Sequence, residues 1–279
     1  GKTTTKELLN SVLSKKHKVL STFGNLNNHI GVPLTLLRLR KEHDFAIIEM
    51  GANHIGDIKE LCEIANPNYG VITNIGKAHM EGFGSFKNII TTKTELYNFV
   101  ENAKGSLFVN LNEAELKNKS INLTDPILYG GDDHLSYNLI PNTELLSLTI
   151  NNQVVKTKLF GNYNAENVLT AYKIGLHFGV STTLIKTALE DYVPTNNRSQ
   201  RTKTKRGNVL ILDAYNANPT SMNLAIDEFS QLKSDKIYIL GEMRELGSIA
   251  NEEHIKIMDK LSDKSNVVFY VGMAFKKFE

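Results

Sequence analysis

Short apolar runs of strand length alternate with helical patterns along most of this sequence, and this alternation constrains the fold more than any other feature. Residues 45–50 (FAIIEM) form a nearly continuous apolar run, which is typical of a strand buried on both faces of a sheet. Similar runs recur, with helical patterns between them, at residues 18–21, 69–75 and 106–110. The alternation predicts an α/β fold with a mostly parallel sheet and helices on both of its faces.

The segment 127–160 departs from this pattern. Residues 145–150 and 154–160 flank Asn151-Asn152, a dipeptide suited to a tight hairpin turn. We therefore expect a small antiparallel addition to the main sheet here. Two helical patterns follow, divided at Gly179.

A polar stretch at residues 194–207 then predicts a linker or a surface hairpin between domains. Strand–helix alternation restarts after it, from residue 209, as expected for an unfinished Rossmann-like unit. The sequence therefore predicts two domains, residues 1–194 and residues 195–279. A chain of 279 residues is long enough for two domains of ordinary size.

Composition excludes several functional classes. Thirty-two basic and thirty acidic residues leave a net charge of +2, too balanced for a protein that binds nucleic acid electrostatically. The single cysteine, Cys62, excludes an internal disulfide framework and a multi-cysteine zinc site, and it fits a reducing cytoplasm. No apolar run approaches the roughly 20 residues of a membrane span. We expect a cytoplasmic monomer without a membrane span, whose partners are small molecules and not nucleic acid.

The opening tripeptide Gly1-Lys2-Thr3 matches the end of the phosphate-binding loop (P-loop) motif G-x-x-x-x-G-K-[ST]. In that motif the backbone N–H groups and the lysine bind phosphates, and the hydroxyl binds Mg²⁺. The helix expected from Thr4 adds the positive end of its dipole. The tripeptide alone is weak evidence, because any helix can begin this way. Since the chain starts without Met and both ends look cut, we expect an internal fragment that lacks the start of this loop.

Two more polar residues are expected at the edge of the sheet where ligands bind. Glu49 lies near the end of FAIIEM, and His79 follows the run at 69–75. Ligands of open parallel sheets bind beyond the carboxyl ends of the strands, so an acid and an imidazole there indicate a Mg²⁺–nucleotide site. The alternatives are a solvated strand end for Glu49 and an ordinary loop histidine for His79.

Lys93 lies in the middle of an apolar helical stripe formed by Phe86, Ile89, Ile90, Leu96, Tyr97 and Val100. A charged amine on such a face is costly unless it is neutralised or paired. One interpretation is that the side chain extends along the helix to reach water. The other is that its pKa is lowered and the neutral amine adds CO₂, which gives a carbamate whose oxygens suit Mg²⁺.

Polar residues later in the chain suggest contacts to the same ligand. Asn164 and Asn167 lie three apart at the start of a predicted helix, so one is expected to be its N-cap and the other to face a base or phosphate. Asp213 ends the first strand after the linker, again at a carboxyl end. Arg198, in the linker, is either a solvated charge or a γ-phosphate contact made across the interdomain cleft.

With these residues assembled, the chain resembles the Mur ligase family over essentially its whole length. The resemblance rests on GKTTTKELL, GNLNNHIGVPLTLLRL, AIIEMGANHIGDI, ITNIGKAHMEGFGS, TTKTELY, GNYNAENVLTA, RSQR, LDAYNANPTSM and LGEMRELG. GNLNNHIGVP and DAYNANP discriminate within the family. One departure is Tyr163-Asn164, where the family often has His-Asn.

The resemblance implies a central ATPase domain, residues 1–194, and an incomplete C-terminal Rossmann-like domain, residues 195–279, with the N-terminal UDP-binding domain absent. It implies catalytic roles for Lys2, Glu49, His79 and Lys93. Two Mg²⁺ ions would be bound by Thr3, Glu49, His79 and carbamylated Lys93. ATP would be contacted by Gly1, Lys2, Thr3, Thr4, Asn164, Asn167, Arg198 and Asp213, with Asn167 at the adenine. Substrate contacts are implied for Asn27, Asn28, Tyr215, Asn216 and Asn218.

The implied reaction is an ATP-dependent amide ligation in peptidoglycan precursor synthesis. ATP would phosphorylate the terminal carboxylate of UDP-N-acetylmuramoyl-tripeptide (UDP-MurNAc-tripeptide), and the amine of D-alanyl-D-alanine would attack the acyl phosphate. Cations offset the charge of the transferring phosphoryl group, which suits the residues above. The alternatives are another ligase of the same fold, such as folylpolyglutamate synthase, or, for this chain as it stands, a nucleotide-binding fragment without activity.

Overall fold

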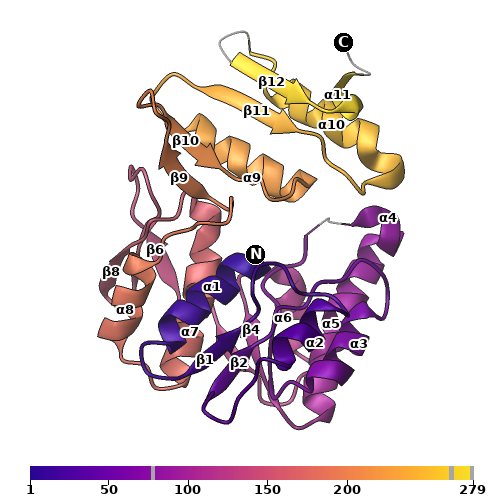
Figure 1. The fold of residues 1–279 in the computed structure, drawn as a ribbon, viewed down its shortest axis with the longest axis vertical. Helices are drawn as coiled ribbons and strands as arrows, with labels where there is room; N and C mark the ends of the chain where they lie inside the picture. The colour runs from indigo at the N-terminus through magenta and orange to yellow at the C-terminus, as the bar shows by residue number, and fades with distance from the viewer. Residues whose placement is uncertain (77–78, 264–266, 277–279) are drawn as a thin grey trace.

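A computed structural model of the chain describes residues 1–76, 79–263 and 267–276, and it consists of a larger part and a smaller C-terminal part joined by a linker (Figure 1). The helices of the larger part are α1 (Lys2–Leu13), α2 (Gly31–Leu36), α3 (Asp57–Ala65), α4 (Met80–Phe83), α5 (Phe86–Asn102), α6 (Ala114–Ser120), α7 (Ala165–His177) and α8 (Thr182–Asp191). Its strands are β1 (Val19–Ser21), β2 (Phe45–Ile47), β3 (Tyr69–Val71), β4 (Ser106–Asn110), β5 (Ile127–Tyr129), β6 (Tyr137–Leu139), β7 (Ser147–Ile150) and β8 (Gln153–Lys156).

The parallel strands of the larger part form two sheets instead of the single sheet that we expected. β1 pairs with β2, and β3, β4 and β5 form a second parallel sheet. A pocket of about 580 Å³, lined mostly by apolar residues, lies between β2 and β3. The prediction that FAIIEM is buried on both faces is therefore wrong, because among the described strands β2 bonds only to β1, and its side chains are half-buried or exposed at the pocket.

The antiparallel strands are confirmed, but they form a sheet of their own and not an addition to the main sheet. β6, β7 and β8 form an antiparallel sheet, and Asn151 (φ 49°) and Asn152 (φ 60°) make the tight turn between β7 and β8. Asparagine tolerates this left-handed conformation better than most residues, which explains the hairpin at this dipeptide. The first strand of the segment 127–160 differs from the prediction, because β5 pairs in parallel with β4.

The linker contains a strand, so the surface-hairpin alternative is confirmed. β9 (Gln200–Lys203) pairs antiparallel with β10 (Val209–Leu212). Beyond it lie α9 (Pro219–Ser230), β11 (Ile237–Gly241), α10 (Ala250–Lys260), β12 (Val267–Val271) and α11 (Met273–Lys276), and β11 and β12 pair in parallel. The expected Rossmann-like alternation is present, although β10 bonds to the linker strand and not to β11 in the described residues.

Packing of α1 fixes the place of the N-terminal residues. Leu8, Leu9, Val12 and Leu13 recur at helical spacing and are buried against α7 and α8 in the largest apolar core. The start of α1 therefore lies on the side of the larger part that faces the C-terminal part (Figure 1). None of the described helices is both long and apolar enough to cross a membrane.

Candidate functional site

A cleft of about 630 Å³ lies between the larger part and the C-terminal part, beyond the ends of β2, β3 and β10. All the site residues predicted from the sequence line this cleft except Asn167. The lining residues among them are Gly1, Lys2, Thr3, Thr4, Asn27, Asn28, Glu49, His79, Lys93, Asn164, Arg198, Asp213, Tyr215, Asn216 and Asn218. Residues more than two hundred positions apart in the sequence thus meet in one cleft.

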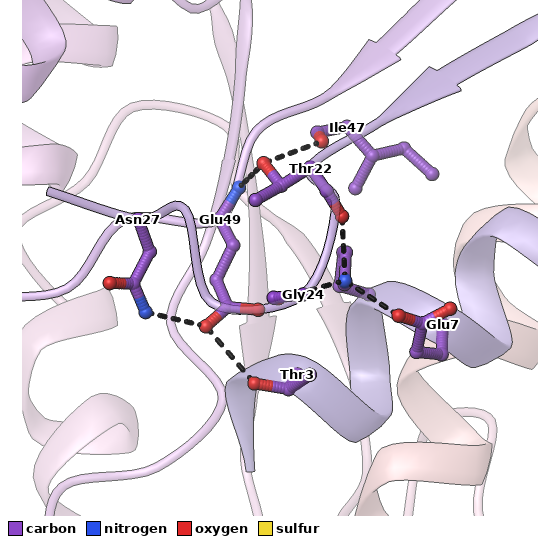
Figure 2. A network of polar contacts seen from close by, with 8 residues as sticks. Thr3, Glu7, Thr22, Gly24, Asn27, Ile47 and Glu49 are labelled. Atoms are coloured by element: carbon purple, nitrogen blue, oxygen red, sulfur yellow. Dashed lines mark hydrogen bonds and ion pairs between the residues drawn. The ribbon is translucent and has the colours of Figure 1, made fainter. Parts of the chain in front are cut away.

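Glu49 is held at the floor of the cleft by two side-chain donors (Figure 2). The Thr3 hydroxyl donates to Glu49 Oε1 at 3.1 Å, and Asn27 Nδ2 donates to the same oxygen at 2.8 Å. The residue is 5% exposed, and its second oxygen, Oε2, is buried without a hydrogen-bond partner. A buried carboxylate oxygen without a donor is costly, so this atom is suited to a cation or another donor in the cleft.

Thr22, which the sequence patterns did not single out, aligns the backbone of Glu49. The Glu49 N–H donates to Thr22 Oγ1 at 2.9 Å (Figure 2). Next to it, Lys6 is 4% exposed, and its ammonium donates to Glu7 and to the carbonyl of Thr22. Lys6 lies on the same helical stripe as Leu9 and Leu13, so the rule that singled out Lys93 predicts a buried lysine here too.

Positive charges crowd the cleft. Desolvation lowers the pKa of Lys2, and the nearby Arg198 adds to this while Glu49 opposes it. Desolvation, with a contribution from Lys2, also lowers the pKa of Lys93 to about 7. Cations that depress one another's pKa values would be stabilised by a bound polyanion, so the charges of the cleft suit a polyphosphate.

The Lys93 side chain reaches a backbone carbonyl at the end of the neighbouring strand. Its ammonium donates to the carbonyl of Asn74, which follows β3, at 2.9 Å. Ile89, Tyr97 and Val100 of the predicted stripe are buried, and Lys93 itself is half-buried at the cleft. The amine therefore lies at the carboxyl edge of the second sheet.

The amides of Asn164 and Asn167 bond to one another and to the linker. Asn164 occupies the N-cap position of α7, which confirms that one of the two asparagines is the N-cap, although its side chain makes no capping hydrogen bond. Its Nδ2 donates instead to Phe160 O and to Ser199 Oγ, at 2.9 Å each. Asn167 is 5% exposed, donates to Asn164 Oδ1 and accepts from the Thr5 hydroxyl. It therefore supports Asn164 from behind the cleft.

Tyr163 joins the two parts at the linker. Its hydroxyl lies 3.0 Å from Ser199 Oγ and donates to Asp213 Oδ2 at 3.4 Å, and Asp213 Oδ1 accepts from the Ser199 N–H. Partial desolvation raises the pKa of Asp213. Gly161 (φ +88°) makes room for the ring, because a Cβ there would clash with the ring carbons of Tyr163.

The remaining predicted residues come from both sides of the cleft. Arg198 lies over the ring of Tyr215, 3.7 Å from its centroid, as in a cation–π contact. Asn218 caps α9 by accepting from the Ser221 N–H. Asn28 similarly accepts from the N–H of Gly31 at the start of α2, and Asn216 Oδ1 accepts from the N–H of Ala217.

His79 Nδ1 bonds to Glu245 of the C-terminal part. The sequence patterns did not single out Glu245, because nothing in its local sequence indicates a contact 166 residues away. Among the residues that the structure describes, His, Cys, Asp and Glu form no group of three or more arranged to hold a metal ion. A cation in this cleft would therefore also need oxygens from Thr3, from Lys93 as its carbamate or from a bound phosphate.

Comparison with protein families gives two matches. Residues 1–175 match the Mur ligase middle domain, and residues 197–278 match the family described as Mur ligase, glutamate ligase domain. The two matches together cover nearly all of the chain.

Individual relatives agree with these matches. UDP-N-acetylmuramoyl-tripeptide–D-alanyl-D-alanine ligase of Bacillus subtilis is 35% identical over 98% of the chain, which spans 61% of that protein. The structure resembles crystal structure I of MurF from Acinetobacter baumannii, with a TM-score of 0.87, 33% identity, and coverage of 99% of this chain and 62% of that one. It also resembles the MurF ligase of Thermotoga maritima in complex with ADP, with a TM-score of 0.84, 25% identity, and coverage of 97% and 68%.

Proposed function

Because the chain belongs to the Mur ligase family, we propose that it is the ATP-binding and C-terminal part of a ligase that joins D-alanyl-D-alanine to UDP-MurNAc-tripeptide. The names of its relatives support this substrate pair. The chain spans about three fifths of the length of the curated relatives that it matches, so the proposal concerns the whole ligase. Within the chain we propose an ATPase domain at residues 1–194, with the end of a P-loop at Gly1-Lys2-Thr3, and a second domain at residues 195–279.

The observation that carries the proposal is the Glu49 carboxylate. One of its oxygens is held by Thr3 and Asn27, and the other is buried without a partner in a cleft that three cationic side chains line. A carboxylate beside a threonine hydroxyl at the start of a helix fits Mg²⁺, which binds through one or two carboxylates and the phosphates of a nucleotide. The ADP bound by the Thermotoga maritima relative supports ATP as the nucleotide.

Each side chain then has a definite task in phosphoryl transfer. Lys2 and Arg198, from opposite sides of the cleft, would offset charge on the phosphates, and Asp213 and Asn164 would contact the nucleotide. Thr3, Glu49, His79 and Lys93 would hold two Mg²⁺ ions, which supply positive charge to the transferring phosphoryl group. Asn27, Asn28, Tyr215, Asn216 and Asn218 would line the path of the peptide substrates. Closure of the cleft would exclude water from the acyl phosphate.

We also propose that Lys93 is carbamylated. The neutral amine attacks CO₂, a C–N bond forms, and a proton leaves to solvent, which gives a negatively charged carbamate. A pKa of about 7 supplies neutral amine at physiological pH, which this reaction requires. The two new oxygens would supplement Glu49 as ligands of a hard cation. We propose that the ligase is a cytoplasmic monomer.

The proposed reaction is tested by measuring the release of ADP and phosphate with different substrate pairs. The whole ligase should release ADP and phosphate only when UDP-MurNAc-tripeptide and D-alanyl-D-alanine are both present, and not with a folate and glutamate. ADP release with the folate pair instead would favour a folylpolyglutamate synthase.

The chain alone should bind ADP with Mg²⁺ by calorimetry, and Lys2→Ala should weaken that binding at least ~10-fold, because a charge-assisted phosphate contact is lost. A chain that binds ADP but supports no ligation would be a nucleotide-binding fragment.

Residues 194–207 are expected to act as a hinge. Domain closure around ATP and the peptide substrates would order this segment, which contacts the C-terminal part where the Ser199 N–H donates to Asp213 Oδ1. Ligands should therefore slow cleavage of the linker by a protease of low specificity, measured by gel electrophoresis over time. The exposed segment 40–44 is the internal control, since its cleavage should not change. Equal cleavage of the linker with and without ligands would contradict the hinge.

A further inference from the structure

The contact between His79 and Glu245 joins the two parts on the side of the cleft opposite the linker. His79 immediately precedes α4, and Glu245 lies in the loop between β11 and the 3₁₀ turn Gly247–Ile249. His79 Nδ1 bonds to Glu245 Oε2, and the Glu81 N–H donates to the Glu245 carbonyl at 3.2 Å. A side-chain bond and a backbone bond therefore hold the same two loops together.

The backbone at both partners has an unusual conformation. His79 (φ 54°) and Glu245 (φ 61°) both lie in the left-handed region, which is uncommon outside glycine, although histidine adopts it more often than glutamate does. Such conformations persist where the surrounding structure holds them, and they cluster at functional sites. In Figure 1, α4 extends from the larger part toward the C-terminal part, which places the two loops together.

The bond decides which imidazole nitrogen is free. A carboxylate oxygen only accepts, so it selects the form of neutral imidazole that carries its proton on Nδ1. The lone pair is then on Nε2, whereas a neutral imidazole in water favours the proton on Nε2. Histidines that bind metals commonly have a carboxylate on their other nitrogen, which fixes the tautomer and the ring.

We propose that Glu245 is a positioning residue for His79: the C-terminal part supplies the carboxylate that keeps Nε2 of His79 free to act as a ligand in the cleft. This inference rests on the proposed function for the role of His79 at the metal, but the tautomer itself does not depend on it. The two parts then assemble one ligand jointly. The ligand form of His79 is populated only while the Glu245 loop is docked, so closure of the parts and readiness of the metal site are coupled.

The tautomer can be measured directly in the 279-residue chain. Two-bond ¹⁵N–¹H spectra of the imidazoles distinguish protonation at Nδ1 from protonation at Nε2. His79→Gln identifies the signals of His79. We expect the Nδ1–H form in the unsubstituted chain, a change to the Nε2–H form in Glu245→Ala, and retention of Nδ1–H in Glu245→Gln, whose amide oxygen still accepts.

Two controls accompany this experiment. The Glu245 side chain is 56% exposed, so its replacement should leave the fold intact, and the signals of buried His254 report on the fold of the C-terminal part. Glu252→Ala removes another exposed carboxylate from the same part and should leave the tautomer of His79 unchanged. An Nε2–H form in the unsubstituted chain, or no change in Glu245→Ala, would overturn the proposal.

Metal affinity gives the second measurement. With ADP present, Mn²⁺ binding followed by electron paramagnetic resonance should weaken about 10-fold in Glu245→Ala, the usual cost of losing a carboxylate behind a metal-binding histidine. Glu252→Ala should bind as the unsubstituted chain does. Unchanged affinity in Glu245→Ala, despite a changed tautomer, would refute the positioning role. If the unsubstituted chain bound neither ADP nor Mn²⁺, the role of His79 as a metal ligand in this chain would fail, and the tautomer alone would decide whether Glu245 orients His79.

Discussion

Glu49→Gln should lower the turnover of the ligase by about 10³-fold while the chain stays folded. Glutamine keeps the shape of the side chain and an oxygen that can accept from Thr3 and Asn27, but it removes the negative charge. Metal-assisted charge stabilisation contributes several kcal/mol to a transition state, and each ~1.4 kcal/mol is a factor of ten in rate. The measurement is phosphate release at saturating ATP and substrates, with thermal unfolding recorded in parallel.

Glu63→Gln is a matched control for this substitution. Glu63 is an exposed glutamate on α3 whose ion pair with Lys59, at 4.0 Å, is of the kind that contributes little to stability. Glu63→Gln should therefore leave the turnover of the ligase unchanged. ADP binding in the absence of metal should also survive Glu49→Gln, because the loss concerns the cation and not the nucleotide. Near-normal turnover of the Glu49 variant would make this carboxylate a structural group that only holds Thr3 and Asn27.

Lys93→Ala should fold normally and lose most ligase activity, and millimolar formate or acetate should restore part of it. The small carboxylate would occupy the space that the carbamate leaves and supply its oxygens to the cation. Lys93→Glu should retain less activity than the rescued alanine variant, because its side chain is shorter than a carbamylated lysine. Initial rates across a series of formate concentrations measure this rescue.

The exposed Lys87, on the same helix, provides the control, since Lys87→Ala should neither lose activity nor respond to formate. Full activity of Lys93→Ala would remove this residue from the metal site. Loss of activity without any response to formate or acetate would keep the position important but contradict the carbamate.

The pKa of Lys93 also predicts how stability depends on pH. The folded chain binds this proton with a pKa of about 7, because burial and Lys2 oppose the charge, whereas the unfolded chain binds it with the ordinary lysine pKa of 10.5. Between these values the unfolded state holds more protons, so the contribution of Lys93 to the free energy of unfolding rises with pH. The cost of burying the ammonium is fully present below about pH 7 and is relieved toward pH 10.5. Chemical denaturation of the chain and of Lys93→Ala at several pH values measures this difference.

The elements could be predicted well where the local pattern is strong. The strand at 106–110 lies at the predicted residues, because a short apolar run with flanking polar residues defines it. The Asn151-Asn152 hairpin followed from the conformational preference of asparagine alone. The cleft residues could be predicted because ligands bind beyond the carboxyl ends of parallel strands, a rule that needs only the strands and their direction.

What the sequence could not supply was pairing over long distances. The division of the parallel strands into two sheets depends on which strands pair with one another. An apolar run such as FAIIEM does not indicate its partner strand. Asn164 is the N-cap of α7 as expected, but its amide bonds to Asn167 and the linker instead of the first turn of the helix, which no local pattern indicates. Glu245 contacts His79 through a left-handed turn that no local pattern indicates.

The separation of the two parallel sheets has a mechanical consequence for the cleft. Glu49 follows β2, while Asn74, which accepts from Lys93, follows β3. In the described residues no backbone ladder joins these two strands, and an apolar pocket lies between them. The distance between the Glu49 carboxylate and the Lys93 amine is therefore set by side-chain packing. Such packing deforms more easily than a hydrogen-bonded sheet. Glu49 and Lys93 therefore follow different hydrogen-bonded sheets, and the distance between them can change without the loss of a hydrogen bond within either sheet.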